Sequence, residues 1–323
     1  HQEEATVAMA QPQRPTPAVD VAPLFWYDGA MVEQSDFEIH PFTHALHYGS
    51  GVFEGIRAYE AGRRLSIFRL KDHMERFLRS AEVYRLKVPY SAAELCDAAA
   101  RTVRENAIGE CYIRPLTWFG AGGLSLAPYS HAPTHVMVAV RPLAGYFSGN
   151  ADRPTVRLTV SPWRKSSSKS LPSTVKCSGH YANSVLAMSD ALSRGFDEAL
   201  MLNEFGRVAE GSGDNVFFVK GGVLYTNDAD EDILPGITRG TVLALAARLA
   251  IPTTVAPFAL EDLLAAEEVF ITGTAAEVAG VRAIDDHEFP HGAKAPVTTR
   301  LQQAYDEAVH AKGPEAAQWC TLL

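Results

Sequence analysis

The sequence predicts an α+β protein of two domains, the first smaller than the second. The chain has 323 residues, 47% of them hydrophobic, which is enough to fill more than one core. Alternating apolar residues, typical of strands, and three-to-four spacing, typical of helices, recur in both halves. A stretch rich in Gly, Pro and polar residues, 142–154, is the expected interdomain linker. We therefore expect a disordered tail over 1–20, a small domain over 21–141 and a large domain over 155–323.

The composition argues against several classes of protein. The chain carries 29 basic and 38 acidic residues, a formal net charge of -9, and no basic stripe of the kind that binds nucleic acid. No apolar run approaches the roughly 20 residues that span a bilayer. The four cysteines are scattered and form no Cys-x-x-Cys pair, which suits a reducing compartment. We expect a cytoplasmic protein that binds neither nucleic acid nor membrane.

The first half opens with strand and turn signals. The apolar run Leu24–Tyr27 is followed by Asp28-Gly29, a hairpin-type dipeptide, and by a return strand. A capping box of Ser91 and Glu94 begins a helix that reaches about residue 106. The same patterns predict a helix over 71–85 and strands over 56–59, 64–69, 111–116 and 135–140, the last of them buried.

Histidines and glycines cluster between these elements. His40, His44 and His47 lie close together, but no acidic or cysteine partner stands at a ligand-like spacing, so we expect no metal site. Gly49 and Gly51 belong to a glycine-rich segment that also includes Gly55, and such a segment predicts close approach of the backbone to another group.

Two arginines of the first half have both an ordinary and a functional interpretation. Arg76 lies four residues after Asp72 on the expected helix and could simply be its solvated partner. Tyr112 and Arg114 share one face of their strand, because strand side chains alternate. That face could recognise a carboxylate, or the strand could be an edge strand that exposes its arginine.

The second half alternates strands and helices. We expect a mobile Ser/Lys-rich loop over 163–170 and a helix-like run that includes Tyr181, Val185, Leu186, Met188 and Leu192. Strands are expected over 155–160, 198–202, 216–219 and 267–272, and helices over 239–250 and 297–311.

Lys176 lies among small and polar residues in the segment Leu171–Gly179. It could be a solvated loop lysine, but a lysine that attacks a carbonyl needs such a confined and partly desolvated setting. Glu210 precedes a turn of tiny residues, so its carboxylate can approach a ligand closely. Two Gly/Thr junctions, at 234–238 and 273–277, are of the kind that binds phosphate. A lysine, an isolated carboxylate, two phosphate-type turns and an arginine together predict a site for pyridoxal phosphate.

Six segments also carry a resemblance to a known family. They are His44–Gly49, Phe53–Arg57, Tyr112–Pro115, Glu210–Asn215, Leu234–Arg239 and Thr272–Glu277. In this order they resemble the signature blocks of the fold-type IV pyridoxal-phosphate enzymes, specifically the branched-chain amino-acid aminotransferases. The resemblance extends from about Phe25 to Tyr305. It implies the D-amino-acid aminotransferase-like fold, pyridoxal 5'-phosphate as cofactor, and a homodimer or higher oligomer.

The resemblance also implies roles for individual residues. Lys176 would be the Schiff-base lysine and proton carrier, Glu210 the partner of the pyridine nitrogen, and Tyr181 that of the phenolic oxygen. The implied cofactor-binding residues are Arg76, Lys176, Tyr181, Glu210, Leu234, Gly236, Ile237, Thr238 and Thr274. The implied substrate-binding residues are Tyr48, Phe53, Gly55, Tyr112, Arg114, Tyr146, Thr274 and Ala275. Arg114 would receive the distal carboxylate of glutamate.

The implied reaction moves the amino group of leucine, isoleucine, valine or a related apolar amino acid to 2-oxoglutarate, so the expected partners are amino acids and 2-oxo acids. Three alternatives stay open on the sequence: a D-amino-acid or (R)-amine transaminase, an aminodeoxychorismate lyase-like enzyme, and a non-catalytic cofactor-binding or scaffold protein. His180 and the loop Ser166–Ser170 depart from the family pattern. We expect these departures to bear on the range of substrates more than on the reaction.

Overall fold

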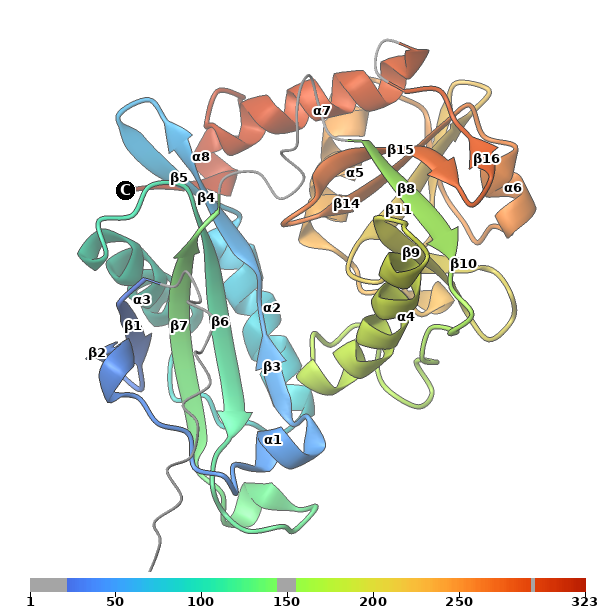
Figure 1. The fold of residues 1–323 in the computed structure, drawn as a ribbon. Helices are drawn as coiled ribbons and strands as arrows, with labels where there is room; N and C mark the ends of the chain where they lie inside the picture. Colours follow the sequence, from blue (N-terminus) through green and yellow to red (C-terminus); the bar gives the residue numbers. More distant parts are fainter. Residues whose placement is uncertain (1–21, 144–154, 292–293) are drawn as a thin grey trace, which may run out of the picture.

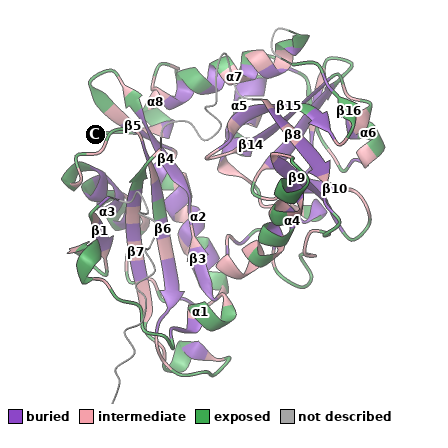
Figure 2. Cartoon of the chain, viewed as in Figure 1, coloured by how far each residue is buried: buried purple, intermediate pink, exposed green. Residues whose placement is uncertain are grey.

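The computed structural model describes residues 22–143, 155–291 and 294–323. In these residues two β-sheets form the framework, and helices pack against both of them (Figure 1). The central strands of each sheet are buried, while the outer surfaces of the helices are largely exposed (Figure 2). The expected α+β fold is confirmed.

The first sheet is antiparallel, in the order β17-β5-β4-β6-β7-β1-β2, with β3 also paired to β6. Its strands are β1 Leu24–Tyr27, β2 Ala30–Glu33, β3 Gly51–Phe53, β4 Ile56–Ala61, β5 Arg64–Phe68, β6 Cys111–Phe119, β7 Thr134–Pro142 and β17 Cys320–Leu322. The helices of this part are η1 Gln34–Asp36, α1 His44–Tyr48, α2 Leu70–Val83, α3 Ala92–Glu105 and η2 Pro128–Ser130. Apolar side chains of α2 and α3 fill the core against this sheet.

Local signals in the first half are confirmed. Asp28 and Gly29 both have positive φ, 45° and 100°, as the two-residue hairpin turn between β1 and β2 requires. Ser91 and Glu94 form both hydrogen bonds of the capping box at the start of α3. The strand expected to be buried over 135–140 is instead buried on one face only, because alternate residues such as Met137 point away from the core.

The second sheet is mixed, in the order β10-β9-β8-β15-β14-β11-β12-β13, with β16 paired to β15. Its strands are β8 Thr155–Val160, β9 Glu198–Leu202, β10 Val208–Gly211, β11 Asn215–Lys220, β12 Val223–Thr226, β13 Thr253–Val255, β14 Glu268–Gly273, β15 Glu277–Ile284 and β16 His287–Glu288. The helices are η3 Ser178–His180, α4 Tyr181–Ser193, η4 Ala229–Glu231, α5 Ile237–Arg248, α6 Leu260–Leu264, α7 Pro296–Val309 and α8 Ala316–Trp319. None of the described helices is long and apolar enough to cross a membrane.

Helix α4 confirms the helix expected after Lys176 but buries the smaller side chains. Ala187 and Ala191 pack against β9, where small residues allow helix and strand to approach closely. Val185 and Leu192 point outward and are 61% and 57% exposed. The large apolar residues that revealed the helix are therefore not the ones that hold it to the sheet.

The end of the chain returns to the first sheet. After α7, strand β17 pairs antiparallel with β5 at the edge of that sheet. Phe68 packs edge-on against Tyr305 and Trp319, which ties the two parts together. Domain boundaries at 141 and 155 stay a prediction, since residues 144–154 lie outside the described residues.

The segment that carries Lys176 docks on the first sheet. Phe53 donates its amide to Lys176 O at 3.1 Å, and Gly179 donates its amide to Gly49 O at 3.0 Å. Gly49 has φ of 63°, and a Cβ there would lie 2.8 Å from Gly179 Cα. The close backbone approach expected around Gly49 is confirmed, and its partner is the lysine segment.

We expect Gly49→Ala to destabilise the protein more than Gly62→Ala. Both glycines have similar φ, 63° and 68°, but a Cβ at Gly62 meets nothing within 4 Å. Backbone strain costs about 1 kcal/mol at each position, and the clash at Gly49 adds about 1–3 kcal/mol. Urea unfolding of the two variants measures the difference. Equal losses would contradict tight docking of the lysine segment.

Candidate active site

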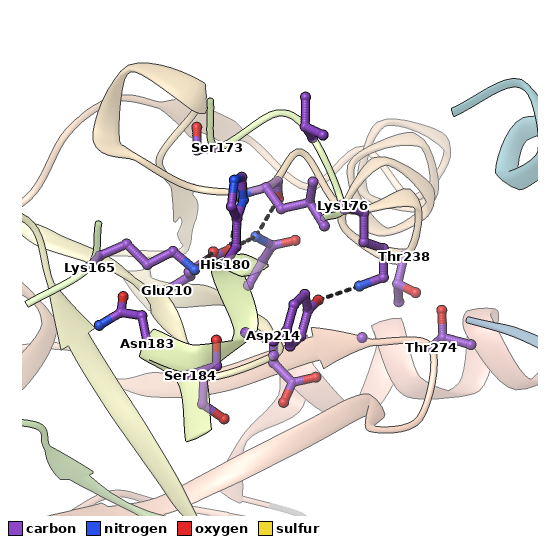
Figure 3. A pocket seen from close by; sticks show the side chains of 18 of the residues that line it. Lys165, Ser173, Lys176, His180, Asn183, Ser184, Glu210, Asp214, Thr238 and Thr274 are labelled. Carbon is purple, nitrogen blue, oxygen red and sulfur yellow. Dashed lines mark hydrogen bonds and ion pairs between the residues drawn. The ribbon is translucent and has the colours of Figure 1, made fainter. Parts of the chain in front are cut away.

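A cavity opens between the two sheets, where the lysine segment meets the first sheet. It has two adjoining parts that share Arg76, Lys176, Tyr181, Asp214 and Thr274 among their lining residues. The first part is also lined by Glu210, Leu234, Gly236, Ile237 and Thr238, and the second part by Phe53, Gly55, Tyr112, Arg114 and Ala275. Figure 3 shows the first part. Every predicted cofactor-binding residue and most of the predicted substrate-binding residues therefore line one cavity.

Lys176 is half-buried, and its Nζ points into the cavity. Nζ donates to Tyr181 Oη at 2.5 Å and lies 4.9 Å from the centre of the Phe53 ring. Burial alone would lower the pKa of Lys176, and Arg76 acts in the same direction, but Tyr181 and Glu54 outweigh them and raise this pKa above its ordinary value. The lysine is confined as expected, yet in this form it is an ammonium that must lose its proton before it can act as a nucleophile.

Arg76 is buried and does not pair with Asp72, so the interpretation as its solvated partner is wrong. Asp72 pairs with Arg69 at 2.6 Å instead. Arg76 donates to both carboxylate oxygens of Glu54, at 2.6 and 2.8 Å, and its Nη1 donates to Pro235 O at 3.2 Å. This last bond holds the guanidinium beside the start of α5.

Glu54 was not identified as a site residue from the sequence, although it lies within a recognised segment. Its side chain has no exposure, and it accepts hydrogen bonds from Arg76 and from His73, the latter at 2.7 Å. Burial alone would raise the pKa of Glu54, but the charges of Arg76 and then His73, with their hydrogen bonds, hold it well below its ordinary value. Glu54 is thus an ionised support that fixes Arg76.

Two backbone junctions face the cavity. Helix α5 begins after Gly236 with no side-chain cap, so the first amides of the helix, at Ile237 and Thr238, remain free for an anion. Thr274 follows the end of β14 and lines both parts of the cavity. Arg76, the free amides and the threonine hydroxyls fit a phosphate group.

Glu210 is a buried carboxylate on β10. Its Oε2 accepts from Asn215 Nδ2 at 2.9 Å and from the amide of Leu234 at 3.2 Å. Its Oε1 pairs with Lys165 Nζ at 2.6 Å. Asn215 and Lys165 were both missed from the sequence: Asn215 lies in a recognised segment, and Lys165 lies in the loop expected to be mobile.

The second part of the cavity presents an aromatic and arginine face. Arg114 donates to Tyr112 Oη at 3.0 Å, and its guanidinium lies 4.7 Å from the centre of the Phe53 ring. Strand β6 lies between β4 and β7, so it is not the edge strand of the alternative interpretation, although Arg114 itself is exposed. A Cβ at Gly55 would overlap the Tyr112 hydroxyl, which explains the glycine there. Arg141, opposite Tyr112 on β7, also lines this part and was missed.

The structure does not bring Tyr48 to the cavity. Its hydroxyl donates to Leu124 O at 3.1 Å, and the residue is 43% exposed. It therefore does not line the substrate pocket of its own chain as expected. Tyr146 lies outside the described residues.

Two further carboxyl groups of the cavity, those of Asp214 and Glu198, were also missed. Burial raises the pKa of each, and the nearby carboxylates Glu198 and Glu210 raise that of Asp214 further.

The clustered histidines of the first half have ordinary partners: His44 bonds Ser50 Oγ at 2.6 Å, and His47 bonds Pro41 O at 2.9 Å. No cluster that could hold a metal occurs among the described residues.

We expect Glu54→Gln to lower the free energy of unfolding by about 3 kcal/mol, because it leaves the buried Arg76 without its counter-ion. Because the folded pKa of Glu54 lies below the unfolded value of about 4.3, this difference is fully present above that value and disappears as the pH falls through the folded pKa. Denaturant unfolding from acidic to neutral pH measures it. The control is Glu75→Gln. Glu75 pairs with Lys71 at 3.8 Å on the surface of α2, so its substitution should change the free energy of unfolding little. A loss equal to that of the control would contradict the supporting role of Glu54.

Comparisons with known proteins agree with this geometry. Residues 51–284 match the family described as "Amino-transferase class IV". The chain is 39% identical over 300 residues to a branched-chain-amino-acid aminotransferase of Pseudomonas aeruginosa, covering 93% of this chain and 97% of that one. Among solved structures, a T.th. branched-chain amino acid aminotransferase complexed with N-(5'-phosphopyridoxyl)-L-glutamate superposes with a TM-score of 0.88 at 43% identity, covering 93% of this chain and 98% of that one. The PLP form of the enzyme from Thermobaculum terrenum gives 0.87 at 31% identity, covering 94% and 99%. This chain belongs to the class IV aminotransferase family.

Proposed function

We propose that this protein is an aminotransferase that uses pyridoxal 5'-phosphate to move the amino group of branched-chain L-amino acids to 2-oxoglutarate. The observation that carries the proposal is the convergence of Lys176, Glu210 and the start of α5 on one cavity. The aromatic and arginine face adjoins them in the same cavity. The choice of substrate is supported by relatives that match this chain over nearly their whole length and are named branched-chain aminotransferases.

The lining residues fit the cofactor group by group. Arg76 and the uncapped start of α5 would hold the phosphate, and Glu210 would hold the proton of the ring nitrogen. In the view of Figure 3, Glu210 and Thr238 lie on opposite sides of Lys176, as a cofactor bound at both ends would require. When bound, the cofactor supplies an aldehyde that accepts the amino group and a ring that withdraws electrons from the substrate α-carbon.

The side chains of the protein would then bind and hold the reacting groups and move protons between them. Lys176 would hold the cofactor covalently and, once displaced by substrate, carry the proton from the substrate α-carbon. Tyr181, which bonds Lys176 Nζ, would orient that amine and hold the phenolic oxygen of the ring. Two successive half-reactions, first with the amino acid and then with 2-oxoglutarate, would return the site to its starting state.

The second part of the cavity would accept both kinds of substrate side chain. Phe53 and Tyr112 offer apolar and aromatic surface to a branched side chain. Arg114 would receive the distal carboxylate of glutamate, since its guanidinium is already oriented by Tyr112 and by the Phe53 ring. Gly55, Thr274 and Ala275 would receive the α-carboxylate.

The reaction is tested by incubating the protein with L-valine and D-valine separately and measuring 2-oxoisovalerate. We expect product from L-valine only, and only with wild-type Lys176. After borohydride reduction the wild type should retain the cofactor through a stable bond seen by mass spectrometry, whereas Lys176→Ala should not. Product from D-valine would favour a D-amino-acid transaminase. Release of pyruvate from aminodeoxychorismate without an amino acceptor would favour a lyase. Cofactor binding without turnover would favour a scaffold protein.

We expect Arg114→Met to separate the two half-reactions. The variant should raise KM for 2-oxoglutarate by about tenfold or more, the value of a charge-assisted pair, and should leave the half-reaction with L-leucine nearly unchanged. Arg141→Met serves as the comparison, since Arg141 lines the same part of the cavity from β7. A larger effect from Arg141 would transfer the role to that residue.

We also propose a homodimer in the cytoplasm. Apolar and aromatic side chains gather on an exposed surface around α1 and the loop before η2, where Leu46 and Leu126 are 63% and 80% exposed. Such surface is typical of a protein contact, and Tyr48, which lies there, would then belong to the contact with a second subunit. Light scattering measures the mass, and a monomer would contradict the proposal.

A further inference from the structure

Lys165 is a second lysine in the cavity, and none of the roles above uses it. Its Nζ lies 2.6 Å from Glu210 Oε1, and the two side chains are only 16% and 6% exposed. Figure 3 shows Lys165 reaching toward Glu210 from the side opposite Thr238. Burying an ion pair costs desolvation energy, so a buried pair at the carboxylate expected to face the pyridine ring needs an explanation.

Hydrogen bonds fix the backbone around Lys165, in the loop that the sequence predicts to be mobile. Lys165 donates its amide to Leu202 O at 2.9 Å. The residues on either side are fixed by one side chain of α4: Asn183 donates to Arg164 O at 3.0 Å and accepts from the amide of Ser166 at 3.1 Å. The backbone of Lys165 is thus held on both sides, and its ion pair with Glu210 holds its Nζ.

The other cations of the first part of the cavity already have partners. Arg76 is paired with Glu54, and Lys176 donates to Tyr181. His180 lines the same part of the cavity beside Lys165, and burial, followed by the positive charge of Lys165, lowers its pKa, so it is neutral near pH 7. Among the described residues, Lys165 is thus the charged partner of Glu210, whose other donors, Asn215 and the Leu234 amide, are neutral.

We propose that Lys165 is a positioning residue that serves as the resident counter-ion of Glu210. While the ring site is empty, Lys165 compensates the buried carboxylate and keeps it aimed into the cavity. When the protonated ring nitrogen arrives, two cations share one carboxylate, and their mutual repulsion weakens the hold on the cofactor. The inference rests on the proposed role of Glu210, and it concerns how readily the cofactor binds and leaves.

The test compares Lys165→Met with Lys169→Met in the full-length chain, freed of cofactor and then titrated with pyridoxal 5'-phosphate. Lys169 lies in the same loop, is exposed and does not line the cavity. We expect Lys165→Met to lower the melting temperature of the cofactor-free chain by several degrees and to bind the cofactor about threefold or more tightly than the wild type. Lys169→Met should change neither quantity, and Lys165→Arg should restore the melting temperature.

A double-mutant cycle with Glu210→Gln in the cofactor-free chain isolates the ion pair. The loss of melting temperature caused by Lys165→Met should largely vanish when residue 210 is already neutral. Absence of coupling, or cofactor binding that is unchanged or weaker in Lys165→Met, would overturn the inference and leave Lys165 a purely structural residue. A wild-type chain that takes up no cofactor would instead refute the proposed function, and the inference with it.

Discussion

The site depends on the docking of the Lys176 segment against the first sheet. The segment belongs to the second half of the chain, yet its backbone is bonded to Phe53 and Gly49 of the first half. This contact places the lysine amine where side chains of both sheets can reach it. It also requires glycines, because Gly49 and Gly179 approach too closely for a side chain at Gly49. The glycine-rich segment is thus part of how the lysine is positioned.

Charge compensation is the second organising feature. The first part of the cavity brings together the cations Arg76, Lys176 and Lys165 with carboxyl groups in partly dry surroundings, where an unpaired charge is costly. Each cation has a specific partner: Glu54 for Arg76, Tyr181 for Lys176 and Glu210 for Lys165. The proposed cofactor would therefore meet an arginine and a carboxylate that other residues already hold in place.

The sequence was most informative where the signal is local. The hairpin at Asp28, the capping box at Ser91 and the Gly/Thr junction that leads into α5 depend on neighbouring residues, and all three appear as elements of the structure. It was least informative where a partner is remote. Glu54 and Arg76 are separated by 22 residues, and no spacing rule joins them. The spacing of the helix instead offers Arg76 an ordinary partner, Asp72, one helical turn away.

The sequence by itself determined the α+β fold and, through six short segments, the family and many of the residues that line the cavity. Only the tertiary structure decided how those residues are charged, held and paired. Lys165 illustrates the reason. Its local sequence predicts a mobile loop, whereas its backbone is held by its own hydrogen bond to Leu202 of the second sheet and by the hydrogen bonds of its two neighbours to Asn183 of α4. Local patterns report what a residue type can do, whereas burial and counter-ions arise from contacts between distant parts of the chain.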